Sequence, residues 1–117
     1  AIWARDFSSS VGMDRDGRFA LITDDRDAVH ALDALSGASV WKQDALARRK
    51  VSRPLIVGDH VIVGDLEGYI HVLDRDTGAF AARDRAGSDP IAADPVPLRR
   101  GFVVQDADGE ITAYEVR

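Results

Sequence analysis

The sequence predicts an all-β fold of about three four-stranded units, because it combines an internal repeat, short β-branched segments and regularly placed turn residues. The two clearest copies, residues 20–37 and 61–78, align without a gap at an offset of 41 residues. Identical residues lie at Asp24/Asp65, His30/His71, Leu32/Leu73, Asp33/Asp74 and Gly37/Gly78. A third copy, from residue 102, keeps Asp106 and Gly109 at the same spacing. A period of about 40–45 residues is typical of one β-propeller blade, so we expect a partial propeller.

Each unit divides into strands, because short apolar segments alternate with Gly, Asp and Pro turns. In the first unit we expect strands at residues 10–13, 19–23, 28–33 and 39–43. In the second we expect them at residues 53–57, 61–63, 69–74 and 79–84. In the third we expect them at residues 92–97, 102–105 and 111–116. Residues 44–50 are rich in Ala, Leu, Arg and Lys, which favours a short helical turn between the first two units.

The two ends of the chain predict a piece of a larger ring. Residues 2–5, Ile-Trp-Ala-Arg, are similar to residues 40–43, so we expect residues 2–6 to be the outer strand of a preceding blade. The third unit stops at residue 117, where its own outer strand should begin. We therefore expect one propeller fragment with blades at about residues 8–43, 51–85 and 92–117. Such a piece exposes strand edges and blade faces, so we expect the isolated fragment to self-associate.

Composition excludes several function classes. The net charge of −5 argues against nucleic acid, which requires clustered Lys and Arg. The nearest basic run, residues 48–50 with Arg53, is interpreted as a solvated loop. The chain has no cysteine, which excludes disulfides, thiolate metal sites and a cysteine nucleophile. No apolar run approaches the length of about 20 residues that a membrane span needs.

The histidines suggest a ligand pair until the repeat is considered. His30 and His71 occupy the same position of successive units, and the third unit has Thr112 there. A position that accepts both His and Thr favours packing or hydrogen bonding over metal binding. His60 is expected in a tight loop. Trp41, like Trp3, is expected to pack between blades.

The recurrent acidic residues are interpreted as turn formers. Asp24, Asp65 and Asp106 begin one turn of each unit, and Asp33 and Asp74 are expected to accept backbone N–H bonds in the next. Residues 14–17 and 106–109 have the Asp-x-Asp-Gly pattern of calcium loops but not the full set of about six oxygen ligands. Spacing alone leaves a carboxylate pair for glycoside hydrolysis open. We assign no catalytic, cofactor-binding or metal-binding residue.

The repeat resembles that of pyrroloquinoline-quinone-type propellers, through residues 31–33 (Ala-Leu-Asp), 36–37 (Ser-Gly), Trp41 and their second-unit counterparts. Ala82 stands where the pattern has its second Trp. Within that superfamily, several segments in order resemble the BamB family of the outer-membrane β-barrel assembly machine. They are residues 2–5, 52–56, 63–71 and 106–114. The segment Gly64-Asp65-x-Glu67-Gly68-Tyr69 is the most distinctive of them.

The resemblance implies a lipoprotein of about eight blades at the periplasmic face of the outer membrane in Gram-negative bacteria. It implies a non-enzymatic scaffold that binds the POTRA domains of BamA and supports assembly and insertion of β-barrel proteins. It implies no cofactor, and it assigns no partner-contact residue to this chain. The alternative is a fragment of a quinoprotein dehydrogenase, a class of enzyme that shares the repeat and carries cofactor and calcium ligands on particular blades.

Overall fold

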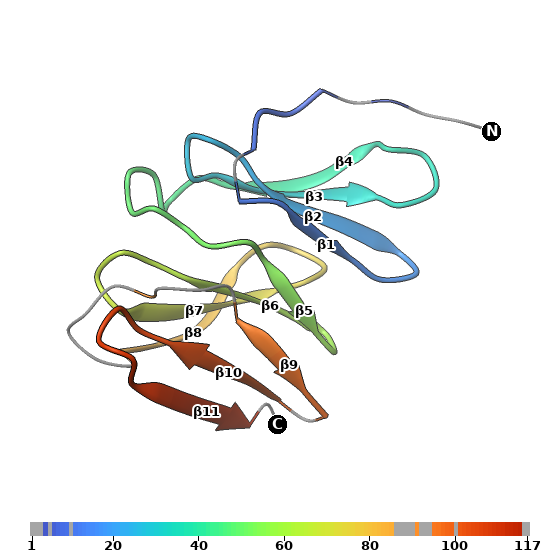
Figure 1. The fold of residues 1–117 in the computed structure, drawn as a ribbon. Helices are drawn as coiled ribbons and strands as arrows, with labels where there is room; N and C mark the ends of the chain where they lie inside the picture. The colour runs from blue at the N-terminus through green and yellow to red at the C-terminus, as the bar shows by residue number, and fades with distance from the viewer. Residues whose placement is uncertain are drawn as a thin grey trace.

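The computed structural model describes residues 4, 6–9, 11–85, 91, 95–99 and 101–115, which form three antiparallel sheets (Figure 1). The first sheet consists of β1 (Met13–Arg15), β2 (Phe19–Thr23), β3 (Val29–Asp33) and β4 (Ser39–Gln43). The second consists of β5 (Leu55–Val57), β6 (His60–Gly64), β7 (Tyr69–Asp74) and β8 (Phe80–Arg85). The third consists of β9 (Val96–Leu98), β10 (Gly101–Gln105) and β11 (Ile111–Glu115). The described residues include no helix that could cross a membrane.

Strands that follow one another in the sequence are neighbours in each sheet, as in the blades of a propeller. The first strands of the three sheets come together, because β5 contacts both β1 and β9 (Figure 1). The last strands, β4 and β8, lie at the opposite edges of their sheets. This arrangement confirms the predicted all-β partial propeller, with one strand after another running from the inner to the outer edge of each blade.

Most predicted strands are confirmed, and their bounds differ in places. The largest difference is in β1, which spans Met13–Arg15 rather than residues 10–13, because Gly12, with φ of 101°, interrupts the extended backbone before it. β5 begins at Leu55 rather than residue 53, because Ser52 and Pro54 do not continue the regular ladder between β5 and β6. The Ser52 hydroxyl accepts the Gly64 N–H, and Pro54 has no N–H for a ladder. His60, expected in a loop, instead begins β6.

The helical turn predicted at residues 44–50 is wrong. The segment forms hydrogen-bonded turns, with Ala47 N–H bonded to the Asp44 carbonyl and Arg49 N–H to the Leu46 carbonyl. Arg48 and Lys50 have φ of 68° and 52°, in the left-handed region that a right-handed helix cannot contain. Leu46 is buried in the core between the first two sheets, so tertiary packing overrides the helix propensity of this segment.

Some predictions concern residues that the structure does not describe. The described residues 4 and 6 are not in the strand expected over residues 2–6, and residues 2, 3 and 5 of that segment, including Trp3, lie outside the described residues. Residues 92–94, expected to begin a strand, also lie outside them, and β9 extends to Leu98. The division into blades at residues 8–43, 51–85 and 92–117 stays a prediction.

Trp41 packs between the first and second sheets, as the sequence predicts. Its side chain is 9% exposed and belongs to a core cluster with residues of both sheets, among them Leu21 and Leu73. The indole Nε1–H donates to the Arg75 carbonyl at 2.6 Å. Gly78 lies against the indole so closely that a Cβ there would come within 2.5 Å of the ring. With φ of 75°, Gly78 also adopts a backbone conformation that favours glycine.

The contact between the second and third sheets is built differently, because Ala82 occupies the position of Trp41 in the next unit. The rings of Phe102 and Tyr114 stack there, 5.0 Å apart, within a second apolar cluster that includes Ile62 and Ile70. Burial, together with the nearby Asp84 carboxylate, raises the pKa of Tyr114 to about 12. The Tyr114 side chain is therefore a neutral packing group at any physiological pH.

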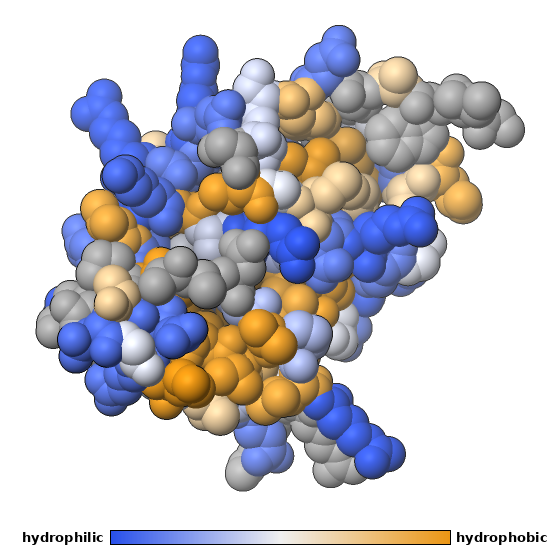
Figure 2. All heavy atoms as spheres, viewed as in Figure 1, coloured by the Kyte–Doolittle hydropathy of each residue, from blue (hydrophilic) through white to orange (hydrophobic). Residues whose placement is uncertain are grey.

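Hydrophobic side chains gather on one face of the molecule over the third sheet (Figure 2). Val96, Leu98 and Ile111 are exposed there. An exposed apolar patch of this kind is typical of a surface that contacts another part of a protein or another chain. Self-association of the isolated fragment stays a prediction.

Candidate functional site

The repeated aspartates close the turn between the second and third strands of each sheet. The Asp65 Oδ1 accepts the N–H groups of Glu67 and Tyr69 at 2.8 and 3.1 Å. Asp24 does the same with the N–H groups of Arg26 and Ala28, and Asp106 with those of Asp108 and Glu110. The structure therefore confirms these three residues as turn formers.

The next turn of each sheet follows the same rule. Asp33 Oδ1 accepts the Leu35 and Ser36 N–H groups, both at 2.9 Å. Asp74 Oδ1 accepts the Asp76 and Thr77 N–H groups at 2.8 and 3.1 Å. These bonds satisfy donors that a tight turn would otherwise leave unpaired, which confirms the predicted role of both aspartates.

The repeat histidines are hydrogen-bonding residues, as predicted, but their partners were missed. His30 Nε2 and His71 Nε2 each lie 2.7 Å from the Oδ2 of the aspartate six residues earlier, Asp24 and Asp65. The signal for this pairing was present in the sequence, because Asp and His recur together at that spacing in two units. The second pair is fully buried, whereas His30 and Asp24 are 13% and 18% exposed.

Burial lowers the pKa of His71, outweighing the attraction of Asp65, and Arg49 and Arg83 lower it further. Burial also raises the pKa of Asp65, but its bonds to His71 and to two backbone N–H groups outweigh burial and hold the pKa below its ordinary value. The pair is therefore a neutral imidazole that donates its Nε2–H to an ionised carboxylate. The other ring nitrogen, Nδ1, is buried and has no partner among the described residues.

Folding stability should fall as the pH drops below the ordinary histidine value of 6.5. The lowered pKa of His71 means that the unfolded chain takes up a proton there before the folded chain does, so protonation favours unfolding. A second loss should follow below 3.8, the ordinary value from which the pKa values of Asp24 and Asp65 are lowered. Urea denaturation at a series of pH values measures both steps.

The control for this pH dependence is the His71→Gln variant, which lacks the titrating imidazole. Its free energy of unfolding should change less with pH between neutrality and the onset of carboxylate protonation, whatever its absolute stability. Equal slopes for the natural protein and the variant would show that the buried imidazole does not set the pH dependence.

Arg49 joins the connection between the first two sheets to the buried pair. Its Nε lies 3.0 Å from the Asp65 Oδ2, its Nη2 lies 3.3 Å from Glu67, and its carbonyl accepts the Leu66 N–H. The interpretation of the basic run as a solvated loop is thus right for the exposed Arg48, Lys50 and Arg53. It is wrong for Arg49, which is partly buried and ion-paired.

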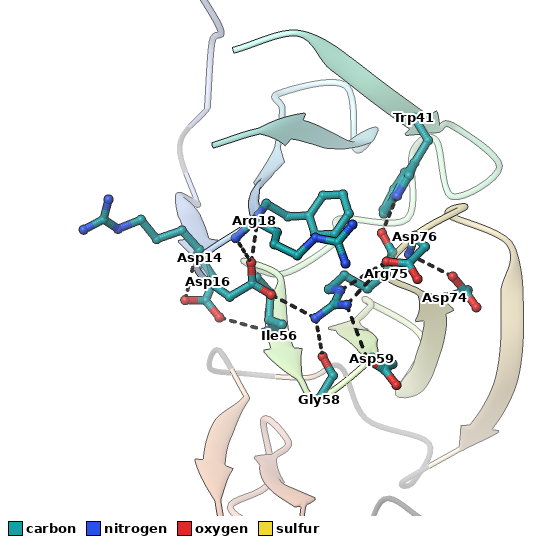
Figure 3. Close-up of polar contacts among 12 residues, drawn as sticks. Asp14, Asp16, Arg18, Trp41, Ile56, Gly58, Asp59, Asp74, Arg75 and Asp76 are labelled. Carbon is teal, nitrogen blue, oxygen red and sulfur yellow. Dashed lines mark hydrogen bonds and ion pairs between the residues drawn. The ribbon is translucent and has the colours of Figure 1, made fainter. Parts of the chain in front are cut away.

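The opposite end of the sheets contains a second polar cluster around Arg75 (Figure 3). Its guanidinium lies 3.1 Å from the Asp16 Oδ2 of the first sheet and 3.3 Å from the Asp59 Oδ1 of its own sheet. It also donates to the Gly58 carbonyl and lies 5.2 Å from the centre of the Phe19 ring. The repeat does not indicate this residue, because the corresponding position in the first unit is Ala34.

The two carboxylates of the Asp-x-Asp-Gly segment at residues 14–17 belong to the same cluster. Asp14 Oδ2 accepts the Ile56 N–H at 2.8 Å across the two sheets (Figure 3). Asp16 Oδ1 accepts the Arg18 and Phe19 N–H groups, while its other oxygen binds Arg75. No group of three or more potential ligands that could hold a metal ion occurs among the described residues. The cluster around Arg75 links the first sheet to the second, and the cluster around Asp65 links the second sheet to the connection that precedes it.

Three meandering sheets joined edge by edge at their first strands, with a Trp–Gly contact between two of them, define a β-propeller of the quinoprotein repeat class. The chain belongs to the BamB family, because the profile described as "Outer membrane protein assembly factor BamB" matches residues 1–43 and 25–117. This confirms the resemblance inferred from the sequence.

Individual relatives agree with the family match. The BamB proteins of Xanthomonas campestris pv. campestris and Bordetella pertussis are 40% and 42% identical to this chain over 98% and 94% of its length. The chain spans 28% of the length of each of these relatives.

Solved structures show the same fold. The crystal structure of BamB from Moraxella catarrhalis superposes with a TM-score of 0.87 at 20% identity, covering 96% of this chain and 34% of that one. A quinohemoprotein alcohol dehydrogenase from Pseudomonas putida HK5 superposes with a TM-score of 0.77 at 23% identity, covering 97% of this chain and 20% of that one. The likeness to the dehydrogenase is one of fold alone.

Proposed function

We propose that this chain is part of a non-enzymatic, protein-binding scaffold that supports assembly and insertion of β-barrel proteins at the periplasmic face of the outer membrane. The observation that carries the proposal is the match to proteins named outer membrane protein assembly factors over nearly the whole chain. The geometry supports it, because the repeated aspartates and histidines bind one another and the backbone of the turns within each sheet.

The proposed partners are the periplasmic POTRA domains of BamA, within the β-barrel assembly machine of a Gram-negative bacterium. A lipid anchor would hold the scaffold at the membrane. We also propose that the blades divide at residues 8–43, 51–85 and 92–117, with the sheets of the structure as their cores. A quinoprotein dehydrogenase is the less supported alternative, since the likeness to such enzymes extends only to the fold.

Immobilised natural protein should bind the purified periplasmic domains of BamA reversibly and saturably, as measured by biolayer interferometry. A quinohemoprotein alcohol dehydrogenase is the matched control, because it presents the same fold without the family's sequence. Binding no stronger than that of the dehydrogenase would overturn the proposed partner.

A quinone titration separates the two functions in the same sample. We expect no saturable absorbance change when pyrroloquinoline quinone and calcium are added to the natural protein, and no reduction of an electron-accepting dye with alcohol as substrate. Quinone-dependent dye reduction would instead support the enzymatic alternative.

A further inference from the structure

Three arginines converge on one tyrosine at the outer part of the second sheet. The guanidinium groups of Arg49, Arg83 and Arg85 lie 5.6, 5.2 and 5.2 Å from the centre of the Tyr69 ring. A cation over an aromatic face is attracted to it, but three like charges around one ring repel each other. We name these four residues the arginine–tyrosine patch. It concentrates positive charge in a chain whose net charge is −5.

The patch is not part of the repeat. At an offset of 41 residues, the first unit has Ser8, Ala28, Lys42 and Asp44 in place of Arg49, Tyr69, Arg83 and Arg85. The turn-forming aspartates and the histidines are kept at that same offset. The patch is therefore specific to the second unit of the two.

A pocket of about 480 Å³ adjoins the patch. Apolar side chains line it, namely Leu46, Phe80, Ala81 and Ala82. Arg49, Arg83 and the buried His71 complete the lining. Phe80 is 45% exposed, so part of an aromatic ring remains available for contact. The pocket offers an apolar surface beside two guanidinium groups.

The two lining arginines differ in what they bind. Arg49 is ion-paired with Asp65 and Glu67. Arg83 has no carboxylate within ion-pair distance among the described residues, and its guanidinium lies over the Tyr69 ring. A guanidinium is well suited to a bidentate bond with a carboxylate. Arg83 is therefore the group in the patch that remains for an anionic ligand.

The position of β8 leaves the surface open to a partner. β8 is the last strand of its sheet, and every residue along it is exposed. The first strands of the three sheets come together at β5, and β8 lies at the opposite edge of its sheet (Figure 1). The pocket is made by β7, β8 and the connection between the first two sheets, all within this chain.

We infer that the arginine–tyrosine patch and its pocket bind an acidic peptide segment of a partner protein. An Asp or Glu carboxylate of the peptide binds Arg83, and a neighbouring apolar side chain packs against Phe80 and Leu46. Charge complementarity selects this occupant, and Tyr and Arg are the residue types that contribute most to protein interfaces. The inference goes beyond the proposed function, because it names a surface and the chemistry of what it binds.

The test is fluorescence anisotropy of the natural protein with a short labelled peptide of alternating Asp and Leu. We expect Arg83→Gln to weaken binding by about tenfold, the effect of losing one charge-assisted bond. Lys42→Gln is the matched control, because it removes a positive charge at the same position of the first sheet and should leave binding unchanged. Added salt should also weaken binding to the natural protein.

Charge reversal gives a second, independent result. Arg83→Glu should lose the Asp–Leu peptide and gain a matching Lys–Leu peptide, while its thermal unfolding stays that of the natural protein because the side chain is exposed. Equal affinity of Arg83→Gln and Lys42→Gln for the Asp–Leu peptide would overturn the inference. It would also be overturned if the natural protein bound an uncharged Asn–Leu peptide as tightly as the Asp–Leu peptide. If the natural protein binds BamA but not the Asp–Leu peptide, this inference alone is contradicted. If it binds the peptide but not BamA, the proposed partner alone is contradicted.

Discussion

Replacing Trp41 with alanine should lower the free energy of unfolding by about 3–5 kcal/mol, the range for removing a buried aromatic side chain. The indole is almost fully buried between the first two sheets and donates to the Arg75 carbonyl. Its loss leaves a cavity and an unpaired acceptor at the contact between two blades. Urea denaturation of the natural protein and the variant measures the difference.

Two further variants make this result specific. Leu35→Ala removes a side chain that is 84% exposed and should change stability by less than about 0.5 kcal/mol. Gly78→Ala should destabilise the natural protein, because its Cβ would overlap the indole, and should cost less when Trp41 is already alanine. If Trp41→Ala differs from the natural protein no more than Leu35→Ala does, the indole does not hold the two sheets together.

Replacing Asp65 with alanine should cost about 3–5 kcal/mol, because it removes a buried acceptor of several hydrogen bonds at once, at about 1–3 kcal/mol for each donor left buried and unpaired. The change leaves two backbone N–H groups of its turn, the His71 Nε2 and the Arg49 guanidinium without their acceptor. Asp24→Ala removes the equivalent carboxylate of the first sheet, which lacks an arginine partner and is partly exposed. It should therefore cost less, about 1–3 kcal/mol.

A double-mutant cycle isolates the Asp65–His71 contact. Thermal or urea unfolding of Asp65→Ala, His71→Leu and the double variant should show a coupling of about 0.5–3 kcal/mol, because the two side chains share one buried hydrogen bond. Additive losses of unfolding free energy would mean that Asp65 stabilises the protein only through its turn and that His71 contributes by packing alone.

Much of the fold could be predicted because the repeat constrains it. The recurring Asp24 and Asp65 mark one turn of each unit, and Gly37 and Gly78 mark the next, so the short apolar segments between turns are predicted to be strands. Helix propensity misled at residues 44–50, where left-handed residues and the burial of Leu46 decide the conformation. Strand starts were misplaced where Gly12 and Pro54 break the ladder.

One contact between sheets could be predicted from the sequence, and others could not. Trp41 was assigned to a blade contact because its type and position are typical of one. Arg75 and Arg49 were missed, because each occurs in one unit only and binds carboxylates far away in the sequence or in a different sheet. Neither periodicity nor composition contains information on which loops meet when sheets stack. The Asp–His pairs were not predicted, although the same spacing of Asp and His in two units was a signal for them.

The central claim is that the repeated polar residues build the blades and do not form the binding or reacting site. Calorimetric titration with the periplasmic domains of BamA tests it most directly, comparing the natural protein with Asp24→Ala at a temperature where both are folded. The account predicts a lower unfolding temperature for Asp24→Ala together with an unchanged affinity. A loss of affinity with an unchanged unfolding temperature would contradict it.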